Sequence, residues 1–392
     1  MWIIDYSEVS ERDLEALQAK IGNWEWELKV FVADILPHDE AQKENLEDRM
    51  MELESLINTF GWVVILEHIQ KRALPDYNTY IWGGKLDEII HEMHQQWANL
   101  LVIWNILKPH QMYNLNEELK KIWAVAWDRV DLILKIFEKN ARTEETKLQI
   151  ELAAIKHMWP RIFNMWMELG RQGWKGSGET NTETMKRHLA RRELEIRKDL
   201  EKYKKVRETH RQGRKQKGFL TVWIVGYTNA WKSSLLNALT NKWVLAEDKL
   251  FATLTTSVWK LWIAPKETSQ SEYMKGTEVL LSDTIGFIRN LPPQLVDAFA
   301  STLEDSIESD LIFHVIDASD PKVVEKIKVV DDILDTIWAT QDKKYIFNKT
   351  DNLSQDELSV IQEKFSYLDP IYISTKTQSG FDEILELMLE YS

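Results

Sequence analysis

The most restrictive feature of this sequence is a loop that begins with glycine and ends in lysine and serine, between an apolar run and a helical pattern. The apolar run is Thr221–Val225, whose branched residues are typical of a strand, and the helical pattern is Ser234–Thr240. Between them lies Gly226-Tyr227-Thr228-Asn229-Ala230-Trp231-Lys232-Ser233. This segment matches the phosphate loop G-x-x-x-x-G-K-S/T except at Trp231, where the pattern has a second glycine. A strand that leads through such a loop into a helix is typical of a parallel α/β sheet.

Further short apolar runs follow the loop and predict the remaining strands of a doubly wound sheet. They are Glu278–Leu281, Leu311–Ile316, Lys344–Phe347 and Pro370–Ile373. Three of these runs lead into polar motifs, which are Asp283-Thr284-Ile285-Gly286, Asn348-Lys349-Thr350-Asp351 and Ser374-Thr375-Lys376. Because ligands of such sheets bind beyond the carboxyl ends of the strands, we expect the motifs to meet at one site.

The phosphate loop and the first polar motif predict a site for nucleotide phosphates and Mg²⁺. Backbone N–H groups at the helix N-terminus would surround the phosphates. Lys232 would reach the β- and γ-phosphates, and Ser233 would bind Mg²⁺. Asp283 is suited to hold the ion through a water molecule, and the N–H of Gly286 is suited to meet the γ-phosphate.

The other two motifs predict that the base is guanine. The Asp351 carboxylate can accept hydrogen bonds from both the ring N–H and the exocyclic amine of guanine, a pair of donors that adenine does not offer. Ser374-Thr375-Lys376 resembles a backbone clasp on the guanine oxygen. A single four-residue match is commonly a surface turn, but four matches in the right order, each after a predicted strand, indicate a GTPase-type domain.

The first 140 residues alternate short apolar runs with helical patterns and predict a small α/β domain. Trp62–Ile69 and Leu100–Ile106 have the composition of strands. Glu40–Phe60 and Lys85–Trp97 have the three- and four-residue spacing of helices. No catalytic constellation stands out among them.

The next segment predicts a helical hairpin. Glu144–Gly170 forms a long helical pattern that Pro160 interrupts, and a second helix is predicted from about Glu183 to His210. The loop between them, Arg171–Glu179, holds three of the chain's 14 glycines. The polar run Arg211–Gly218 is interpreted as a linker.

The second helix of the hairpin is strongly basic. Residues 186–217 contain fourteen Lys and Arg against five acidic residues, which gives +9 in a chain of net charge −14. Charged residues on long helices usually form a solvated face, but pairing within the helix cannot neutralise this excess. The basic excess therefore favours contact with an RNA backbone.

Composition excludes several kinds of site and location. The chain has no cysteine, which excludes disulfides and thiolate metal sites. His91 and His94 lie three residues apart on a predicted helix but have no evident third ligand, so we interpret them as surface histidines. No apolar run reaches the roughly 18 residues of a membrane span, and Met1–Asp5 lacks the features of a signal peptide. We expect a cytoplasmic, monomeric protein without stable membrane insertion.

The motifs and several other runs resemble the HflX family of translation-factor GTPases. In the second half of the chain these runs are Gly226–Thr240, Phe251–Leu254 and Asp283–Pro292. In the first half they are Tyr80–Glu88, Asp128–Phe137, Ala141–Ala153 and Arg171–Thr180. The resemblance covers roughly residues 45 to 392.

The resemblance implies an α/β protein of three parts. They are an N-terminal α/β domain in residues 1–140, a coiled-coil-like helical hairpin linker in 141–217, and a Ras-like, doubly wound P-loop GTPase domain in 218–392. It also implies hydrolysis of GTP to GDP with Mg²⁺ as cofactor, and association with the 50S ribosomal subunit through large-subunit rRNA at the basic hairpin. Members of the family are linked to splitting or rescuing ribosomes under stress.

The resemblance also assigns expected roles to residues. Thr253 would be the switch I threonine that closes over Mg²⁺ and the γ-phosphate, with Thr256 as an alternative, so the expected metal ligands are Ser233, Thr253 and Asp283. The catalytic candidates are Lys232, Thr253, Gly286 and Phe287. The expected nucleotide contacts are Gly226, Tyr227, Thr228, Asn229, Ala230, Trp231, Lys232, Ser233, Ser234, Phe251, Thr253, Asp283, Gly286, Asn348, Lys349, Asp351, Ser374, Thr375 and Lys376.

Phe287 stands where Ras-like enzymes carry a glutamine that orients the attacking water. A phenylalanine cannot orient water, so we expect slow intrinsic hydrolysis that a partner accelerates. Packing in the core is the alternative interpretation of this side chain, and it does not exclude the first.

The departures from the family pattern are concentrated at glycine positions. Trp231, Trp82 and Trp174 stand where the family has glycine, Thr375 stands where it has alanine, and the whole chain has 18 tryptophans. We expect position 231 to need a positive φ and a close approach to phosphate, so a tryptophan there should weaken nucleotide binding and slow hydrolysis. Two alternatives stay open: a ribosome- or RNA-binding adaptor with an impaired, non-hydrolysing G domain, and an ordinary regulatory G protein that acts on a protein partner.

Overall fold

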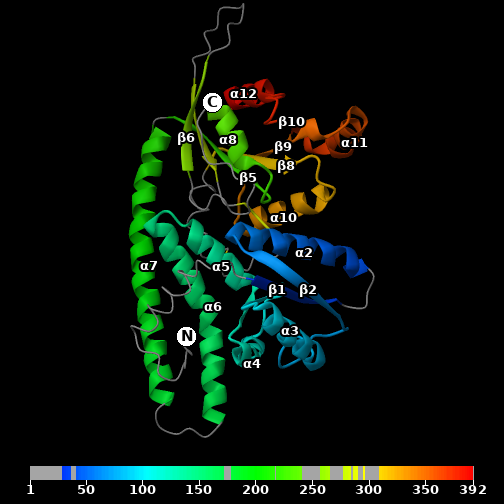
Figure 1. Cartoon of the computed structure of the whole chain (residues 1–392). Coiled ribbons are helices and arrows are strands. Elements are labelled where there is room, and N and C mark those ends of the chain that lie inside the picture. Colours follow the sequence, from blue (N-terminus) through cyan, green and yellow to red (C-terminus); the bar gives the residue numbers. More distant parts are fainter. Residues whose placement is uncertain are drawn as a thin grey trace, which may run out of the picture. The chain divides into compact units, whose positions relative to one another are not determined.

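The computed structural model describes residues 29–36, 41–171, 178–216, 218–240, 257–264, 277–283, 286–289, 295 and 309–391. Its internal contacts divide the chain into two compact units. The first unit is Met1–Lys139 with Ile150–Lys198, and the second is Asn140–Gln149 with Asp199–Ser392. Figure 1 labels most of the helices and strands.

The first unit contains a parallel four-stranded sheet in the order β2-β1-β3-β4. The strands are β1 (Lys29–Leu36), β2 (Val63–Lys71), β3 (Leu100–Ile103) and β4 (Val125–Asp128). The expected α/β class is confirmed. Sequence reasoning missed β1 and β4, and it extended β3 three residues too far.

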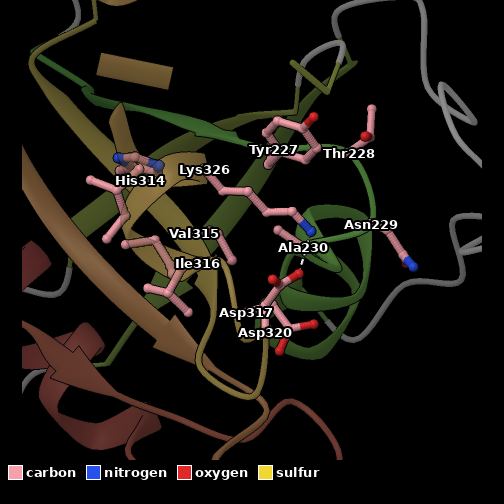
Figure 2. A pocket seen from close by; sticks show the side chains of 12 residues that line it. Tyr227, Thr228, Asn229, Ala230, His314, Val315, Ile316, Asp317, Asp320 and Lys326 are labelled. Carbon is pink, nitrogen blue, oxygen red and sulfur yellow. Dashed lines mark hydrogen bonds and ion pairs between the residues drawn. The ribbon is translucent and has the colours of Figure 1, made fainter. Parts of the chain in front are cut away.

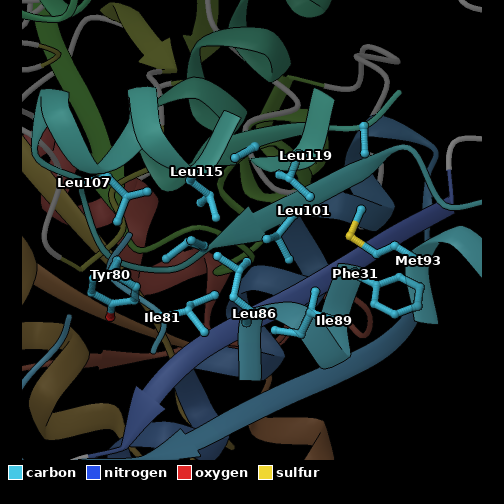
Figure 3. Close-up of a cluster of buried hydrophobic side chains, with 14 of the residues drawn as sticks. Phe31, Tyr80, Ile81, Leu86, Ile89, Met93, Leu101, Leu107, Leu115 and Leu119 are labelled. Atoms are coloured by element: carbon cyan, nitrogen blue, oxygen red, sulfur yellow. The ribbon is translucent and has the colours of Figure 1, made fainter. Parts of the chain in front are cut away.

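Helices pack against this sheet and bury its apolar side chains. They are α2 (Ala41–Phe60), α3 (Gly83–Gln96), α4 (Pro109–Leu119), the 3-10 turn η1 (Lys120–Ile122) and α5 (Arg129–Asn140). Figure 3 shows the core that one face of β1 and β3 forms with α3 and α4. Phe31 and Leu101 come from the strands, and Ile89 and Leu115 come from the helices. The three- and four-residue spacing of apolar residues in α3 produces its buried stripe.

Two long helices form the predicted hairpin, α6 (Glu144–Arg171) and α7 (Gly178–Gln216). Arg192 of α7 donates two hydrogen bonds to the Glu151 carboxylate of α6, at 2.6 and 2.8 Å. The structure corrects two expectations here. Helix α6 continues through Pro160, and most of the predicted linker is helical because α7 ends only at Gln216.

The second unit contains a six-stranded sheet in the order β10-β9-β8-β5-β7-β6. All neighbouring strands are parallel except β6, which is antiparallel to β7. The strands are β5 (Leu220–Gly226), β6 (Ser257–Ile263), β7 (Thr277–Asp283), β8 (Leu311–Asp317), β9 (Asp342–Asn348) and β10 (Ile371–Tyr372). The order confirms the doubly wound sheet, and β6 is the strand that sequence reasoning missed.

Helices cover the two faces of this sheet in separate apolar clusters. Side chains of α8 (Lys232–Thr240) and α12 (Phe381–Glu390) pack on one face, and those of α10 (Val323–Thr336) and α11 (Gln355–Phe365) belong to the other cluster. Two 3-10 turns, η2 (Thr350–Asn352) and η3 (Ser366–Leu368), connect the last elements. All strands except antiparallel β6 point their carboxyl ends at one edge, where the polar motifs lie.

Candidate functional site

The phosphate-loop segment begins where β5 ends, at Gly226. A Cβ atom at this position would lie 2.3 Å from the carbonyl oxygen of Val315 in β8, so only glycine fits between the two strands. The loop then turns into α8, which starts at Lys232. Ser234 follows in the first turn of this helix, half-buried.

Lys232 is buried beneath the loop, with 7% of its surface exposed. Its ammonium group donates a hydrogen bond to the carbonyl oxygen of Tyr227 at 2.9 Å. Burial lowers the pKa of Lys232 to about 8, although the charge of Asp283 acts in the opposite direction. An anion bound at the loop would therefore favour the charged form of this lysine.

Trp231 adopts a left-handed conformation, with a φ of 61°. This confirms the expectation that the position requires a positive φ, which glycine adopts without strain. The indole is 41% exposed, and Lys349 Nζ lies 5.1 Å from its ring centroid. The side chain that replaces the family glycine thus lies beside the lysine of the predicted guanine motif.

The predicted metal ligands Ser233 and Asp283 are in direct contact. Ser233 Oγ donates a hydrogen bond to Asp283 Oδ2 at 2.7 Å, and Asp283 is fully buried at the end of β7. A hydroxyl and a carboxylate are oxygen donors of the type that Mg²⁺ prefers. Thr253, the third expected ligand, lies outside the described residues, as do Phe251, Thr256 and Trp174.

Gly286 and Phe287 lie directly against the phosphate loop. A Cβ atom on Gly286 would meet Thr228 Cα at 3.0 Å, so a side chain there would separate the two segments. The backbone of Phe287 donates to Gly226 O at 3.1 Å and accepts from Thr228 N at 2.8 Å. The phenyl ring is only 2% exposed, so its side chain is part of the core.

The two predicted guanine motifs contact each other and the phosphate loop through Asn348. This buried side chain accepts hydrogen bonds from the backbone N–H of Lys349 at 2.8 Å and of Thr375 at 3.1 Å. Its amide group lies 3.5 Å from the carbonyl oxygen of Ala230 in the phosphate loop. One asparagine therefore links its own motif to two of the other three.

Asp351 is held by the last motif. Ser374 Oγ donates a hydrogen bond to Asp351 Oδ1 at 2.6 Å, and Lys376 Nζ lies 3.8 Å from Oδ2. These contacts fix one carboxylate oxygen while leaving acceptor capacity on the group.

Sequence reasoning missed Asp317, the last residue of β8. Its carboxylate forms a 2.6 Å ion pair with Lys349 Nζ. The signal that could have identified it is its position directly after the predicted strand Leu311–Ile316. Asp317 also lines a pocket of about 50 Å³ together with Thr228, Asn229 and Ala230 (Figure 2).

Outside this site, the described part of the chain contains one group of side chains with metal-ligand spacing, Asp128, Asp131 and His157. Arg161 donates hydrogen bonds to both carboxylates at 2.7 to 2.9 Å, so an arginine already neutralises the group. Burial opposes the charged imidazole, but the two aspartates raise the pKa of His157 to about 9. The network is interpreted as an ion cluster within the first unit.

Two further expectations concern exposed residues and membranes. His91 and His94 are exposed, which confirms their interpretation as surface histidines. None of the helices in the described ranges has the length and apolar character that crossing a bilayer requires.

Comparison with known proteins identifies the family. Residues 47–138 match the model for a GTP-binding GTPase N-terminal region, 140–214 match its middle region, and 221–349 match a model described as a 50S ribosome-binding GTPase. GTPase HflX of Caldanaerobacter subterraneus is 41% identical over 345 residues, which cover 87% of this chain and 76% of that protein. The chain belongs to the HflX family of GTPases.

Another HflX relative and one solved structure are also similar to this chain. GTPase HflX of Escherichia coli is 35% identical over 355 residues, or 89% of this chain and 80% of that protein. The crystal structure of SsGBP in complex with GDP aligns with a TM-score of 0.51 at 25% identity, covering 93% of this chain and 98% of that one. HflX membership confirms the resemblance seen in the sequence, and with it the expectation of a GTPase.

Proposed function

We propose that this chain hydrolyses GTP at the four-motif site of its second unit and acts on the 50S ribosomal subunit, with a role in ribosome splitting or rescue under stress. The observation that carries the proposal is the convergence on Asn348, which contacts the backbone of Lys349, Thr375 and Ala230. A base-recognition motif and a phosphate loop joined by one buried side chain support binding of a single nucleotide across both.

Guanine recognition is proposed for Asp351 and its neighbours. The Ser374 hydroxyl already donates to Oδ1, so the carboxylate is fixed in position before any base binds. The Asp317–Lys349 ion pair restrains the lysine of the same motif. Such preorganisation lowers the entropy that binding must otherwise spend on ordering side chains.

Phosphate and metal binding are proposed for the loop and its neighbours. Lys232 is the buried cation of the loop, and Ser233 with Asp283 offers a hydroxyl and a carboxylate to Mg²⁺. When bound, Mg²⁺ would neutralise charge on the β- and γ-phosphates. Gly286 provides a backbone N–H beside the loop, and Thr253 is the proposed third metal ligand.

Slow intrinsic hydrolysis is proposed because Phe287 is buried and apolar. It has no group that can orient water, and its side chain lies in the core at 2% exposure. The group that orients the attacking water must then come from the partner. The 50S subunit is the proposed partner, in agreement with the description of the matched family model.

Contact with large-subunit rRNA is proposed for the basic helix α7. The Arg191 side chain is 81% exposed, and its ion pair with Glu195 is an ordinary surface pair within one helix. Arg192 differs because it contacts Glu151 across the hairpin and supports the hairpin itself. We keep residues 1–140, 141–217 and 218–392 as the proposed functional parts.

The direct experiment is titration of the purified chain with fluorescent GDP and GTP analogues, with and without 50S subunits, followed by measurement of phosphate release. The proposal predicts binding of both nucleotides and faster GTP hydrolysis when 50S subunits are present. Binding to 50S subunits without nucleotide binding would instead support the adaptor function, which the indole of Trp231 beside Lys349 favours. Absence of 50S binding would contradict the proposed partner.

A further inference from the structure

Tyr227 links the phosphate loop to the segment that follows the Asp283 motif. Its hydroxyl oxygen accepts a hydrogen bond from the backbone N–H of Arg289 at 3.0 Å. Its carbonyl oxygen accepts the hydrogen bond from Lys232 Nζ at 2.9 Å. The residue is only 7% exposed, so these contacts are formed in the interior. One residue therefore contacts both the phosphate-binding lysine and the backbone of Arg289.

The two segments also pair through their backbones. Tyr227 and Phe287 form a parallel bridge, with hydrogen bonds from Phe287 N to Gly226 O and from Thr228 N to Phe287 O. Upstream, Ile224 pairs with Asp283 in the regular ladder between β5 and β7. Between these two pairs, the segment that continues from β7 is one residue longer than the segment that continues from β5. The bridge at Tyr227 is thus a second contact, separate from the strand ladder.

The ring of Tyr227 is held from the side of α10. Lys326 Nζ lies 5.0 Å from the ring centroid, and the same lysine forms an ion pair with Asp320. Figure 2 shows Tyr227 and Lys326 on the wall of one pocket, with Asp320 at the end of the lysine side chain. The ring is therefore fixed by a cation on one element and by a backbone N–H on another.

We propose that Tyr227 is a positioning residue for GTP hydrolysis, which holds residues 286–289 against the phosphate loop and couples nucleotide binding to the backbone of Arg289. This inference rests on the proposed function, because it assumes that nucleotide phosphates bind at Lys232 and Gly286. The side chain of Tyr227 touches no reacting atom in this account. It acts through Arg289 and through the register of the backbone bridge.

The coupling follows because Lys232 and Arg289 both bond to Tyr227, the first at its carbonyl oxygen and the second at its phenol oxygen. Phosphates that bind the Lys232 ammonium group change the hydrogen bond that this group donates to Tyr227 O. The Tyr227 backbone also carries the phenol that binds Arg289 N, three residues after Gly286. A shift at the loop therefore displaces the segment that must approach the γ-phosphate, because both are bonded to one residue.

Tyr227→Phe tests this inference with little change in shape. The variant keeps the ring above Lys326 and the backbone contacts, and removes the phenol oxygen that accepts from Arg289 N–H. Tyr391→Phe is the matched control, because its hydroxyl donates to Asp342 at 3.1 Å in the same unit, directly after α12. Three quantities are measured in each protein: amide hydrogen exchange at Arg289, GDP affinity, and GTP hydrolysis with 50S subunits.

Tyr227→Phe should accelerate exchange of the Arg289 amide at least fivefold and slow GTP hydrolysis at least threefold, while GDP affinity changes less than twofold. Tyr391→Phe should change none of the three. Unchanged exchange at Arg289 would overturn the inference, and so would equal losses of GDP affinity and hydrolysis. If Tyr227→Phe fails to fold, Lys326→Met serves as the second variant, with faster exchange at Arg289 expected and unchanged exchange contradicting the inference. A parent protein that shows no GTP hydrolysis would contradict the proposed function, whereas the exchange result tests the Tyr227 contact independently.

Discussion

Trp231 and Trp338 adopt the same left-handed backbone conformation, with φ values of 61° and 60°, within one unit of the protein. Trp231 lies in the phosphate loop beside Lys349, whereas Trp338 follows α10 and is 82% exposed. A side chain other than glycine in this conformation costs roughly 1–2 kcal/mol. Comparing variants at these two positions therefore separates the free-energy cost of the left-handed backbone from the effect of the indole on the nucleotide site.

Replacing Trp231 by glycine should strengthen nucleotide binding at least tenfold and speed hydrolysis. The physical reason is removal of both the strained φ and the indole beside the guanine motif. The measurement is the Kd for fluorescent GDP by titration. Trp338→Gly is the control, and it should raise stability without changing that Kd. Equal nucleotide affinity in Trp231→Gly and the parent would show that the loop accommodates the indole.

Replacing Trp97 by glycine should stabilise the first unit by about 0.5–1 kcal/mol. Trp97 caps the C-terminus of α3 at a φ of 55°, a position that glycine prefers. The gain is smaller than the strain itself because glycine also increases the entropy of the unfolded chain. Urea unfolding followed by far-UV circular dichroism measures the change. A lower midpoint in Trp97→Gly would mean that the indole contributes packing that outweighs the strain.

Exposed basic residues of α7 should carry the salt dependence of 50S binding. Replacing Arg191 and Lys198 by glutamine removes two exposed charges, so the slope of log affinity against log salt should fall by roughly 1.4–1.8. The matched control replaces Lys328 and Lys364, two exposed lysines on α10 and α11, and should leave the slope unchanged. Sedimentation with 50S subunits at several salt concentrations provides the measurement.

Nucleotide affinity serves as an internal reference for the α7 variant. It should equal that of the parent, because Arg191 and Lys198 lie in the first unit and the four motifs lie in the second. Arg192 is left in place because its two hydrogen bonds to Glu151 join the helices of the hairpin. A parental salt slope in the double variant would refute the rRNA assignment of α7.

His157 and His314 should give stability opposite dependences on pH. The aspartates beside His157 raise its pKa to about 9, so its stabilising contribution is complete below about pH 6.5 and is lost as the pH rises through 9. Burial lowers the pKa of His314, so its contribution is complete above about pH 6.5 and is lost as the pH falls.

Urea unfolding between pH 5 and pH 10 measures both contributions. His157→Gln should flatten the loss of stability between about pH 7 and pH 9, and His314→Phe should flatten the loss below about pH 6.5. Each variant is the control for the other, because the two histidines lie in different units. Parental slopes in both variants would contradict the assigned pKa directions.

The motifs of the second unit could be predicted because each is short, local and placed at the end of a strand. Strand β1 could not be predicted with the same ease, because buried Asp34 interrupts its apolar run. That carboxylate is accommodated by the Tyr80 hydroxyl at 2.7 Å, from a residue 46 positions along the chain. The sequence near β1 contains no sign of this partner. Burial raises the pKa of Asp34 despite the hydrogen bond from Tyr80.

Helix α6 shows a second limit of prediction from the local sequence pattern. Pro160 removes one helical hydrogen bond, which usually ends or bends a helix. Here His157 and Arg161, on either side of the proline, both contact the carboxylate of Asp131. These tertiary contacts hold both sides of the proline against the same carboxylate. Asp317 also escaped prediction, because its contact with Lys349 depends on the β8–β9 register that pairs Asp317 with Asn348.

We propose that Asp351 makes the second unit specific for guanine nucleotides. Each charge-assisted hydrogen bond to the base is worth about 1.5–3 kcal/mol, and two should give a preference on the order of 10² or more. Asp351→Asn keeps an acceptor for the Ser374 hydroxyl but loses the carboxylate charge and one acceptor. It should erase most of the preference for GTP over ATP.

The most direct measurement is competition of unlabelled GTP and ATP for a fluorescent GDP bound to the second-unit site, in the parent and in Asp351→Asn. Ser379→Ala, at an exposed position after the last motif, is the control and should retain the parental preference. The account predicts displacement by GTP at concentrations at least a hundredfold below those of ATP in the parent, and a ratio near one in Asp351→Asn. Equal displacement by GTP and ATP in the parent would contradict it.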